Sequence, residues 1–306
     1  MILVLAGGTL SALFLNDTIV LMLTPVVIQV TRAVGRPPLP YLLALALAAN
    51  VGSVATVTGN PQNLIVSVAG PISYAAFAAA LAPIALVGLG IVIAVIALLH
   101  RRDVTGPAFA RPTPIALPPM TVRLGLLSAT TAAMLVAFVA GAPVAVAALA
   151  AGALALLLVG ASGPVVVRRV DWSLLVLFAG LFVVVGAVGE TGAAERAFAA
   201  LHGALAGGVV PLALLAAVAS NLLSNVPAVL LLLPAVTSMG GIAELLVLAM
   251  ASTLAGNLTL VGSIANLIVA ESARRHGIEI GFWAYARVGV PVTLTSLAFG
   301  VWWLAR

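Results

Sequence analysis

Apolar runs, separated by short breaks that carry arginine, proline or glycine, make up most of the chain. Five runs have the length of one membrane-spanning helix, about 20 residues. Each predicts a transmembrane segment: 73–99, 124–140, 143–160, 172–189 and 288–304. Four longer stretches are interrupted by polar residues near the middle: 1–31, 39–69, 209–239 and 241–270. Because lipid cannot satisfy free backbone groups, such interruptions persist only where protein or a water-filled cavity surrounds them.

The stretches 1–31 and 209–239 are too long for one simple span and too short for two. We predict that each is a re-entrant hairpin, which enters and leaves the membrane on the same side. With 209–239 folded in this way, most arginines fall in loops on one side, at 32–36, 100–123, 168–169 and 274–287. Cytoplasmic loops carry such an excess of arginine. The alternative is one long, tilted helix that is kinked at Pro227.

An internal repeat relates the two halves of the chain. Under shifts of 209 positions for the hairpins and 203 positions for the broken helices, the matching pairs include Asn16 with Asn225, Gly59 with Gly262, and Asn63 with Asn266. An odd number of predicted transmembrane segments separates the hairpins, so the second unit is inverted in the membrane. Inverted repeats with broken helices are typical of secondary transporters. The chain therefore divides into a first repeat (1–99), a cytoplasmic linker (100–123) and a second, inverted repeat (124–306).

The two units differ in what precedes their hairpins. Three predicted spans and a linker come before Asn225, whereas only a short apolar arm comes before Asn16. We therefore expect the first repeat to lack its N-terminal scaffold helices in this chain.

The composition fits a membrane protein and excludes other classes. Hydrophobic residues make up 63% of the chain and charged residues 7%, whereas a soluble domain has about 25% charged residues. A soluble fold of this length could not bury so much apolar side chain, and a disordered chain needs the opposite balance. Aromatic residues reach only 5%, which favours helices over a β-barrel. The fold class is an all-α polytopic membrane protein.

Charge and residue usage also limit the chemistry. The net charge of +5 fits arginine in cytoplasmic loops, so we expect no nucleic-acid partner. The absence of cysteine excludes disulfides and thiolate metal sites. The chain has no metal-binding histidine pair, no catalytic Ser/His/Asp set and no phosphate-binding loop of an ATPase. We expect no enzyme activity and no cofactor, with Na⁺ as a candidate coupling ion.

The polar breaks carry the chemistry that remains. Helix N-termini at a break present free N–H groups that suit an anion, whereas C-terminal carbonyls, with Asn and Ser oxygens, suit a cation such as Na⁺. Asparagines at matching places in both units indicate function, but they could also simply cap helix ends. Gly59 and Gly262 allow the backbone to approach a ligand closely, or only permit packing. For Ser11 and Ser220, helix packing is the favoured interpretation.

Asp17 is the one carboxylate that the sequence places well inside the membrane region. An acid at that depth is a proton carrier or a cation ligand by default, and the alternative is a helix cap. The second unit has Val226 at the matching position. This asymmetry predicts that the two half-sites do different work.

Four motifs resemble those of the ion transporter superfamily, which includes divalent anion:sodium symporters, citrate transporter-like permeases and arsenite efflux permeases. The motifs are Phe14-Leu15-Asn16-Asp17-Thr18, Thr58-Gly59-Asn60-Pro61-Gln62-Asn63, Ser224-Asn225-Val226 and Val261-Gly262-Ser263-Ile264-Ala265-Asn266. The resemblance covers essentially the whole chain but does not identify a substrate. Val226 replaces the usual Thr, and the last motif lacks the proline pair of carboxylate symporters. The departures at Asp17 and Val226 weaken a two-sodium carboxylate model and resemble the Asn-Asp-Thr tip of the arsenite-type permeases.

The resemblance implies a scaffold and a transport domain, elevator-type movement, and a homodimer. It implies cation-binding residues at the hairpin tips and breaks, namely Asn16, Asp17, Gly59, Ser224, Asn225 and Gly262. It implies substrate-binding residues between the tips, namely Thr18, Asn60, Asn63, Ser263 and Asn266.

The sequence thus predicts a secondary active transporter of a small anion or oxyanion, coupled to Na⁺ or H⁺. It would lie in the bacterial cytoplasmic (inner) membrane, within the lipid bilayer, with its C-terminus outside. An arsenite or metalloid efflux permease and a Na⁺/H⁺ antiporter are alternatives within the superfamily. A passive ion channel is the alternative from another class.

Overall fold

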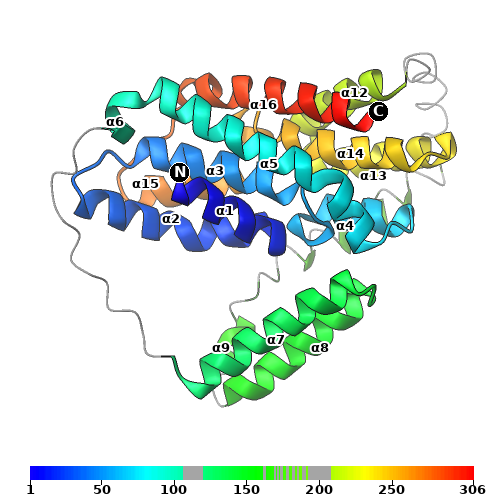
Figure 1. Ribbon diagram of the computed structural model, residues 1–306, viewed down its shortest axis with the longest axis horizontal. Coiled ribbons are helices and arrows are strands. Elements are labelled where there is room, and N and C mark those ends of the chain that lie inside the picture. Colours follow the sequence, from blue (N-terminus) through cyan, green and yellow to red (C-terminus); the bar gives the residue numbers. More distant parts are fainter. Residues whose placement is uncertain are drawn as a thin grey trace.

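All regular structure in the described part of the chain is helical (Figure 1). The computed structural model describes residues 1–105, 120–160, 163–168 and 208–306, with isolated positions between 170 and 191. No strand occurs among these residues, so the all-α fold class is confirmed. The predicted linker 100–123 lies partly outside the described residues, and the predicted transmembrane segment 172–189 is described only at isolated positions.

The first unit consists of a helical pair, a broken helix and a long helix. They are α1 (Ile2–Leu13), α2 (Asn16–Ala33), α3 (Leu39–Ser53), the 3₁₀ turn η1 (Val57–Gly59), α4 (Pro61–Ala69) and α5 (Tyr74–Leu99). The short α6 (Arg101–Thr105) follows. Asn60 stops the extended backbone after η1 and starts α4, because its side-chain oxygen accepts from the backbone N–H of Asn63 at 2.9 Å. Pro61 takes the first helical position, where no N–H is needed.

The second unit repeats this order. Its elements are α12 (Val209–Leu223), α13 (Asn225–Met239), α14 (Ile242–Ala255), η3 (Leu260–Gly262), α15 (Ile264–Arg275) and α16 (Phe282–Leu304). The last helix begins earlier than the predicted span 288–304 and includes Arg287. Arg287 is exposed on its helix, and a long arginine side chain can direct its charge away from an apolar surface.

The two units run in opposite directions. In Figure 1, α5 ends beside α6 on the left, whereas α16 ends on the right at the C-terminus. The indole N–H of Trp303, near the end of α16, donates to the carbonyl of Ala80, near the start of α5, at 3.0 Å. The long helices of the two units are therefore antiparallel neighbours, as an inverted repeat requires.

Both predicted hairpins are helical pairs that reverse the chain. The tip of the first lies at the C-terminal end of α3, since Thr56 binds the carbonyl of Ala12 and Asn16 binds Asn50. The tip of the second lies at the C-terminal end of α14, where Asn221 donates to the carbonyl of Ala255 at 2.8 Å. The chain breaks between α12 and α13 and does not continue as one kinked helix.

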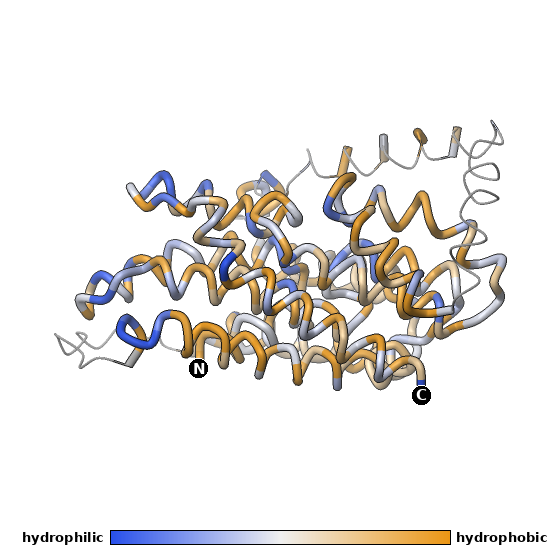
Figure 2. Tube along the Cα trace, turned by 90° about the horizontal axis from the view of Figure 1, so that it is seen from above, coloured by the Kyte–Doolittle hydropathy of each residue, from blue (hydrophilic) through white to orange (hydrophobic). Residues whose placement is uncertain are grey.

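Basic segments that are distant in the sequence meet at one end of the bundle. Arg32 donates to the carbonyl of His276 at 2.6 Å, and Arg36 donates to the carbonyl of Asp103 at 2.7 Å. Figure 2 shows hydrophilic residues concentrated at this end, on the left, with hydrophobic residues along the lengths of the helices. The predicted basic loop 32–36 therefore meets the described start of 100–123 and the start of 274–287 at one end.

Helices long and apolar enough to cross a membrane occur in both units. Among the described residues they are Tyr74–Leu99, Val122–Val139 (α7) and Phe282–Leu304. The pair formed by α7 and the shorter α8 (Val144–Val159) lies apart from the main bundle in Figure 1, next to α9 (Gly163–Arg168). In this pair only Phe138 is buried, and its ring lies 5.5 Å from that of Tyr74.

Candidate functional site

The two broken helices meet inside the bundle, where polar side chains are enclosed. The asparagines Asn50, Asn63, Asn257 and Asn266 are fully buried. A buried amide without hydrogen-bond partners costs about 1–3 kcal/mol, so such a cluster needs internal partners. The structure supplies them in two kinds of place. We call the contacts between a hairpin tip and the break of its own unit the junctions, and the contacts between the broken helices of the two units the crossings.

The first junction joins the end of α1 to η1. Thr56 donates to the carbonyl of Ala12, and Thr58 donates to the carbonyl of Leu13 at 3.4 Å. The hydroxyl of Thr58 also lies 3.1 Å from that of Tyr74. These threonines satisfy carbonyls that the end of a helix leaves free. The junction is therefore a cluster of carbonyl and hydroxyl oxygens.

The second junction has the same design but an added side chain. Thr259 donates to the side-chain oxygen of Asn221 at 3.1 Å, so an amide stands where the first unit uses a backbone carbonyl. Asn225 lies close by and, with its amide oriented to satisfy its neighbours, donates to the carbonyls of Ser252 at 3.0 Å and Gly262 at 3.3 Å. Asn225 and Gly262 are thus brought together.

Glycine at both breaks serves close packing of the chain on itself. A Cβ atom at Gly59 would lie 2.1 Å from the carbonyl oxygen of Ser53. A Cβ atom at Gly262 would lie 2.8 Å from the side-chain oxygen of Asn221. At both glycines the protein's own oxygens lie where a side chain would begin, which fits the packing interpretation.

Asn63 and Asn266 play matching parts in closing the breaks. Asn63 donates to the carbonyls of Ser53 at 2.9 Å and Thr56 at 2.8 Å. Asn266 donates to the equivalent carbonyls of Gly256 at 2.7 Å and Thr259 at 3.2 Å. Neither caps its helix, and in both cases the amide oxygen remains for the opposite unit.

The first crossing is built around Asn50 of α3. Its side-chain oxygen accepts from Asn16 at 3.0 Å and from Ser263 at 3.0 Å. Its amide nitrogen donates to Asn257 at 2.9 Å and to Asn266 at 3.0 Å. Asn50 therefore links the first hairpin tip to the second broken helix, and Asn16 acts through this bond and not as a cap.

The second crossing is built around Thr253 of α14. Its hydroxyl accepts from Asn60 at 3.2 Å and from Gln62 at 3.2 Å, and lies 3.4 Å from the side-chain oxygen of Asn63. Gln62 in turn lies 3.3 Å from the amide oxygen of Asn225. This crossing links the second hairpin tip to the first broken helix.

The remaining predicted residues lie at the hairpin tips. Asp17 is half-buried in the first turn of α2, and its backbone N–H donates to the side-chain oxygen of Asn16 at 2.9 Å. Thr18 is exposed, and Ser224 is half-buried. Ser224 has a φ of 78° and a ψ of 158°, a backbone region that side chains other than glycine rarely adopt. The backbone at the tip of the second hairpin is therefore strained.

Several polar residues at the site were not singled out in the sequence. They are Asn50, Asn221, Thr253 and Asn257. The 203-position shift does place Asn50 on Thr253, but the two residues differ in type and therefore give no match. For Asn50, Asn221 and Thr253, the signal is a polar residue on an otherwise apolar helix.

Ser11 and Ser220 stand out in another way. Both are fully buried, they coincide under the 209-position shift, and each lies in the first arm of its hairpin. Among the described residues, their hydroxyls are the buried side-chain polar atoms that have no hydrogen-bond partner. A buried hydroxyl in this state is a potential ligand for an ion.

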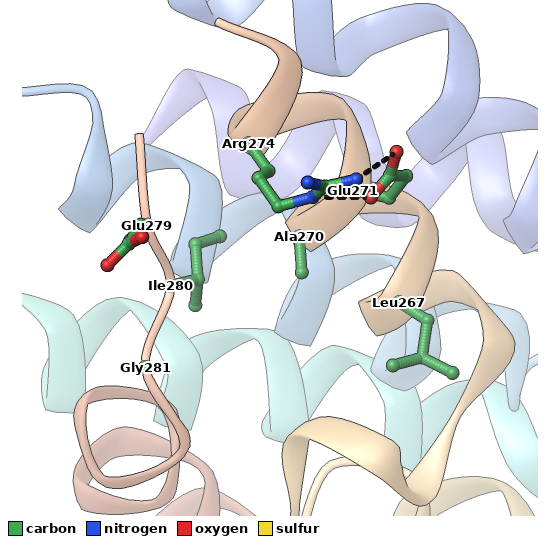
Figure 3. A pocket seen from close by; sticks show the side chains of 7 residues that line it. All are labelled: Leu267, Ala270, Glu271, Arg274, Glu279, Ile280 and Gly281. Carbon is green, nitrogen blue, oxygen red and sulfur yellow. Dashed lines mark hydrogen bonds and ion pairs between the residues drawn. The ribbon is translucent and has the colours of Figure 1, made fainter. Parts of the chain in front are cut away.

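A separate hollow of about 420 Å³ lies on the outer face of α15 (Figure 3). Figure 3 shows Glu271 and Arg274 side by side on the helix, with the Nε of Arg274 2.9 Å from the carboxylate. Arg275 binds the same carboxylate at 3.1 Å. These pairs are exposed and contribute little to stability. None of the buried asparagines lines this hollow.

No group of three or more His, Asp or Glu residues that could hold a metal ion occurs in the described residues. Any cation at the junctions would therefore be held by carbonyl, amide and hydroxyl oxygens. These are the ligands that hard cations use.

Comparison with known proteins identifies the kind of protein. The family model for the citrate transporter (CitMHS) matches residues 1–255. The chain is 30% identical to the silicon efflux transporter LSI3 of Oryza sativa subsp. japonica, over 95% of this chain and 75% of that protein. It is 33% identical to the uncharacterized transporter Rv2685 of Mycobacterium tuberculosis, over 99% of this chain and 76% of that protein. It is 38% identical to the putative transporter arsB of Dictyostelium discoideum, over 44% of this chain and 25% of that protein.

The family match covers both hairpins and the first broken helix, and the relatives extend the similarity to nearly the whole chain. The resemblance drawn from the four motifs is thereby confirmed. The chain belongs to the citrate transporter family and is a membrane transporter.

Proposed function

We propose that the protein is a secondary active transporter of a small anion or oxyanion, coupled to Na⁺ or H⁺. The observation that carries this proposal is the pair of buried hydroxyls at Ser11 and Ser220, which have no partner and occupy equivalent places in two inverted units. Each lies in a hairpin arm that ends at a junction of carbonyl, amide and hydroxyl oxygens. Such a shell fits a desolvated cation.

The anion would bind between the units, near the crossings. The N-termini of α4 and α15 point free N–H groups and the positive ends of their dipoles toward this region. Asn60, Asn63, Ser263 and Asn266 lie in the first turns of these helices or directly before them. They would contact the solute once the crossings open, together with Thr18 from the first tip.

Asp17 favours proton coupling as the second candidate. The first unit has this carboxylate at its tip, and the second unit has Val226. An acid at membrane depth can carry a proton. A silicon efflux transporter among the relatives adds weight to the alternative of metalloid or oxyanion efflux by H⁺ exchange.

Orientation follows from the basic end. Arg32, Arg36, Arg274 and Arg275 lie at the same end of the bundle, which the positive-inside rule assigns to the cytoplasm. The C-terminus lies at the opposite end, beside the start of α5. We therefore place it outside a bacterial inner membrane. The small contact between Phe138 and Tyr74 suits a scaffold pair along which the bundle slides, in an elevator mechanism of a homodimer.

The test is ion-dependent stabilisation of the purified protein, because a ligand that binds only the folded state raises its stability. We expect NaCl to raise the midpoint of thermal unfolding above that in choline chloride, or a fall in pH to do so if H⁺ couples. A panel of anions and oxyanions added with the effective cation then identifies the solute class.

Variants connect this result to the two serines. Ser11→Ala and Ser220→Ala should each reduce the stabilisation by the ion. Ser296→Ala is the matched control, since Ser296 is equally buried but binds the carbonyl of Val292 in its own helix. Reconstituted protein whose solute flux ignores both Na⁺ and pH gradients contradicts the proposal. Flux without saturable counterflow favours a channel.

A further inference from the structure

We propose that Asn50 and Thr253 are positioning residues, each of which holds the ligand-bearing half of the broken helix in the opposite unit. The inference rests on the proposed function, because the groups so positioned are the proposed solute ligands. The two residues are equivalent under the 203-position shift, and both are almost completely buried. Neither lies at a hairpin tip or at the break of its own helix.

Every donor and acceptor of the Asn50 side chain is engaged in a hydrogen bond. A carboxamide has two acceptor sites and two N–H groups, and all four are engaged at 2.9–3.0 Å. Three of the four partners belong to the second unit, and two of these, Ser263 and Asn266, stand at the start of α15. The start of α15 is therefore fixed by a residue of α3.

Thr253 performs the reciprocal task. Asn60 and Gln62 donate to its hydroxyl, and both stand at the start of α4. The hydroxyl proton has a partner in the carbonyl of Ala249 on its own helix, at 2.8 Å. The start of α4 is therefore held by a residue of α14. Each unit thus positions the second half of the broken helix in the other unit.

The hydrogen bonds that Asn50 and Thr253 make to the opposite unit, which we call the two ties, differ in length. The contacts from Thr253 to the opposite unit are 3.2–3.4 Å long, whereas those of Asn50 are 2.9–3.0 Å. The usual N–H···O distance is about 2.7–3.2 Å, so the two N–H contacts of Thr253 lie at the long, weaker end of that range. The start of α4 is thus held less firmly than the start of α15. The second crossing, next to Asn225, is then the one that opens more readily to admit solute.

Cysteine labelling can measure each tie separately, because the chain has no cysteine of its own. Val66 in α4 and Val269 in α15 are equivalent under the same shift, and both are fully buried. Val66→Cys and Val269→Cys, made singly, report the opening of the two half-helices through their rates of reaction with a maleimide. We expect Val66→Cys to react faster than Val269→Cys.

Substitution of the positioning residues should change these rates crosswise. Thr253→Val removes the hydroxyl with little change of shape, and should raise the rate at Val66→Cys at least about tenfold while leaving Val269→Cys nearly unchanged. Asn50→Leu should do the reverse. If Asn50→Leu does not fold, Asn50→Thr, which installs the residue of the second unit, takes its place. Thr24→Val is the control, since Thr24 is buried but binds only the carbonyl of Val20 in its own helix.

The outcomes separate the possible roles. A positioning role across the units requires the crosswise pattern. If Thr253→Val accelerates Val269→Cys, in its own unit, as much as Val66→Cys, the residue only stabilises the fold and the proposal is wrong. Labelling needs no transported solute, so its failure is distinct from failure of the proposed function. That function fails instead if no cation or anion stabilises the unsubstituted protein.

Discussion

The two units have the same order of helices, but different groups join the first hairpin arm to the broken helix in each unit. In the first unit, α1 and α3 meet backbone to backbone, since a Cβ atom on Gly52 would lie 2.1 Å from the carbonyl oxygen of Gly8. In the second unit, the equivalent positions are Ala217 and Ala255. There the amide of Asn221 bridges the two helices, donating to the carbonyl of Ala217 at 3.1 Å and that of Ala255 at 2.8 Å.

This difference continues at the tips and the crossings. The first unit places Asp17 at its tip, and the second unit places Val226 on a strained turn at Ser224. The first unit contributes a fully bonded amide to its crossing, and the second contributes a hydroxyl. The two units have the same order of helices but different polar side chains at equivalent positions. This difference indicates that the two half-sites have different roles in binding. Substitutions at equivalent positions test where the units depart from equivalence.

The largest effect should come from the contact between α1 and α3. Gly52→Ala places a methyl group against backbone that cannot move aside, so α1 must separate from α3, and overpacking of this kind costs about 1–3 kcal/mol or more. We expect loss of folded protein, measured as monodisperse yield and thermal midpoint in detergent. Ala255→Gly at the equivalent position should lower stability by only about 1 kcal/mol. Equal stability of the two variants would show that the helices do not meet as closely as described.

The next largest effect concerns transport itself. Asn225→Ala removes the amide that lies between Gly262, Ser252 and Gln62. We expect flux in proteoliposomes to fall at least about tenfold, with the protein still monodisperse. Leu222→Ala, an exposed position in the same hairpin, is the control and should transport normally. Wild-type flux in Asn225→Ala would remove the second tip from the binding site.

Asp17 distinguishes the tips by charge. Asp17→Asn keeps the shape of the side chain but removes its charge, so we expect the dependence of flux on pH or Na⁺ to weaken while the thermal midpoint changes little. Measurement of flux across a series of pH and Na⁺ gradients gives the result. An unchanged ion dependence would leave Asp17 as a helix-terminal residue without a role in coupling.

The sequence predicts the hairpins and broken helices because their Asn and Gly residues coincide under simple shifts. The shifts identify Asn16, Gly59 and Asn63, and the structure has all three at or near the junctions and crossings. The helix-cap alternative is wrong for Asn16, whose amide binds Asn50, and for Asn63 and Asn266, whose amides bind carbonyls of their own breaks. The residues that cap α4 and α15 are Asn60 and Ser263.

The crossings could not be predicted in the same way. Asn50 and Asn266 are 216 positions apart, and a single polar residue in an apolar helix has no spacing that identifies its partner. Only the inverted packing of α3 against α15 brings them together. For the same reason, the sequence grouped each tip with its own break and missed the link to the opposite unit.

The smallest expected effect tests the strained turn. Ser224 adopts a positive φ of 78°, whereas Leu15, at the equivalent tip, has a φ of −61° and a ψ of 127°. A non-glycine residue in the region of Ser224 costs about 1–3 kcal/mol, so Ser224→Gly should raise the thermal midpoint by a few degrees. Leu15→Gly should lower it, because glycine gains nothing there and loses more chain entropy on folding.

The same pair of variants connects strain to function. If the strain at Ser224 holds the second tip ready to open, Ser224→Gly should also slow the maleimide reaction at Val66→Cys, since the relaxed turn stabilises the closed crossing. Leu15→Gly should have no such effect on that cysteine, because the first tip is tied to Asn50 and not to Thr253. A midpoint that falls in Ser224→Gly would mean that its hydroxyl, and not its backbone, determines the tip. The two tips would then differ in side-chain chemistry alone.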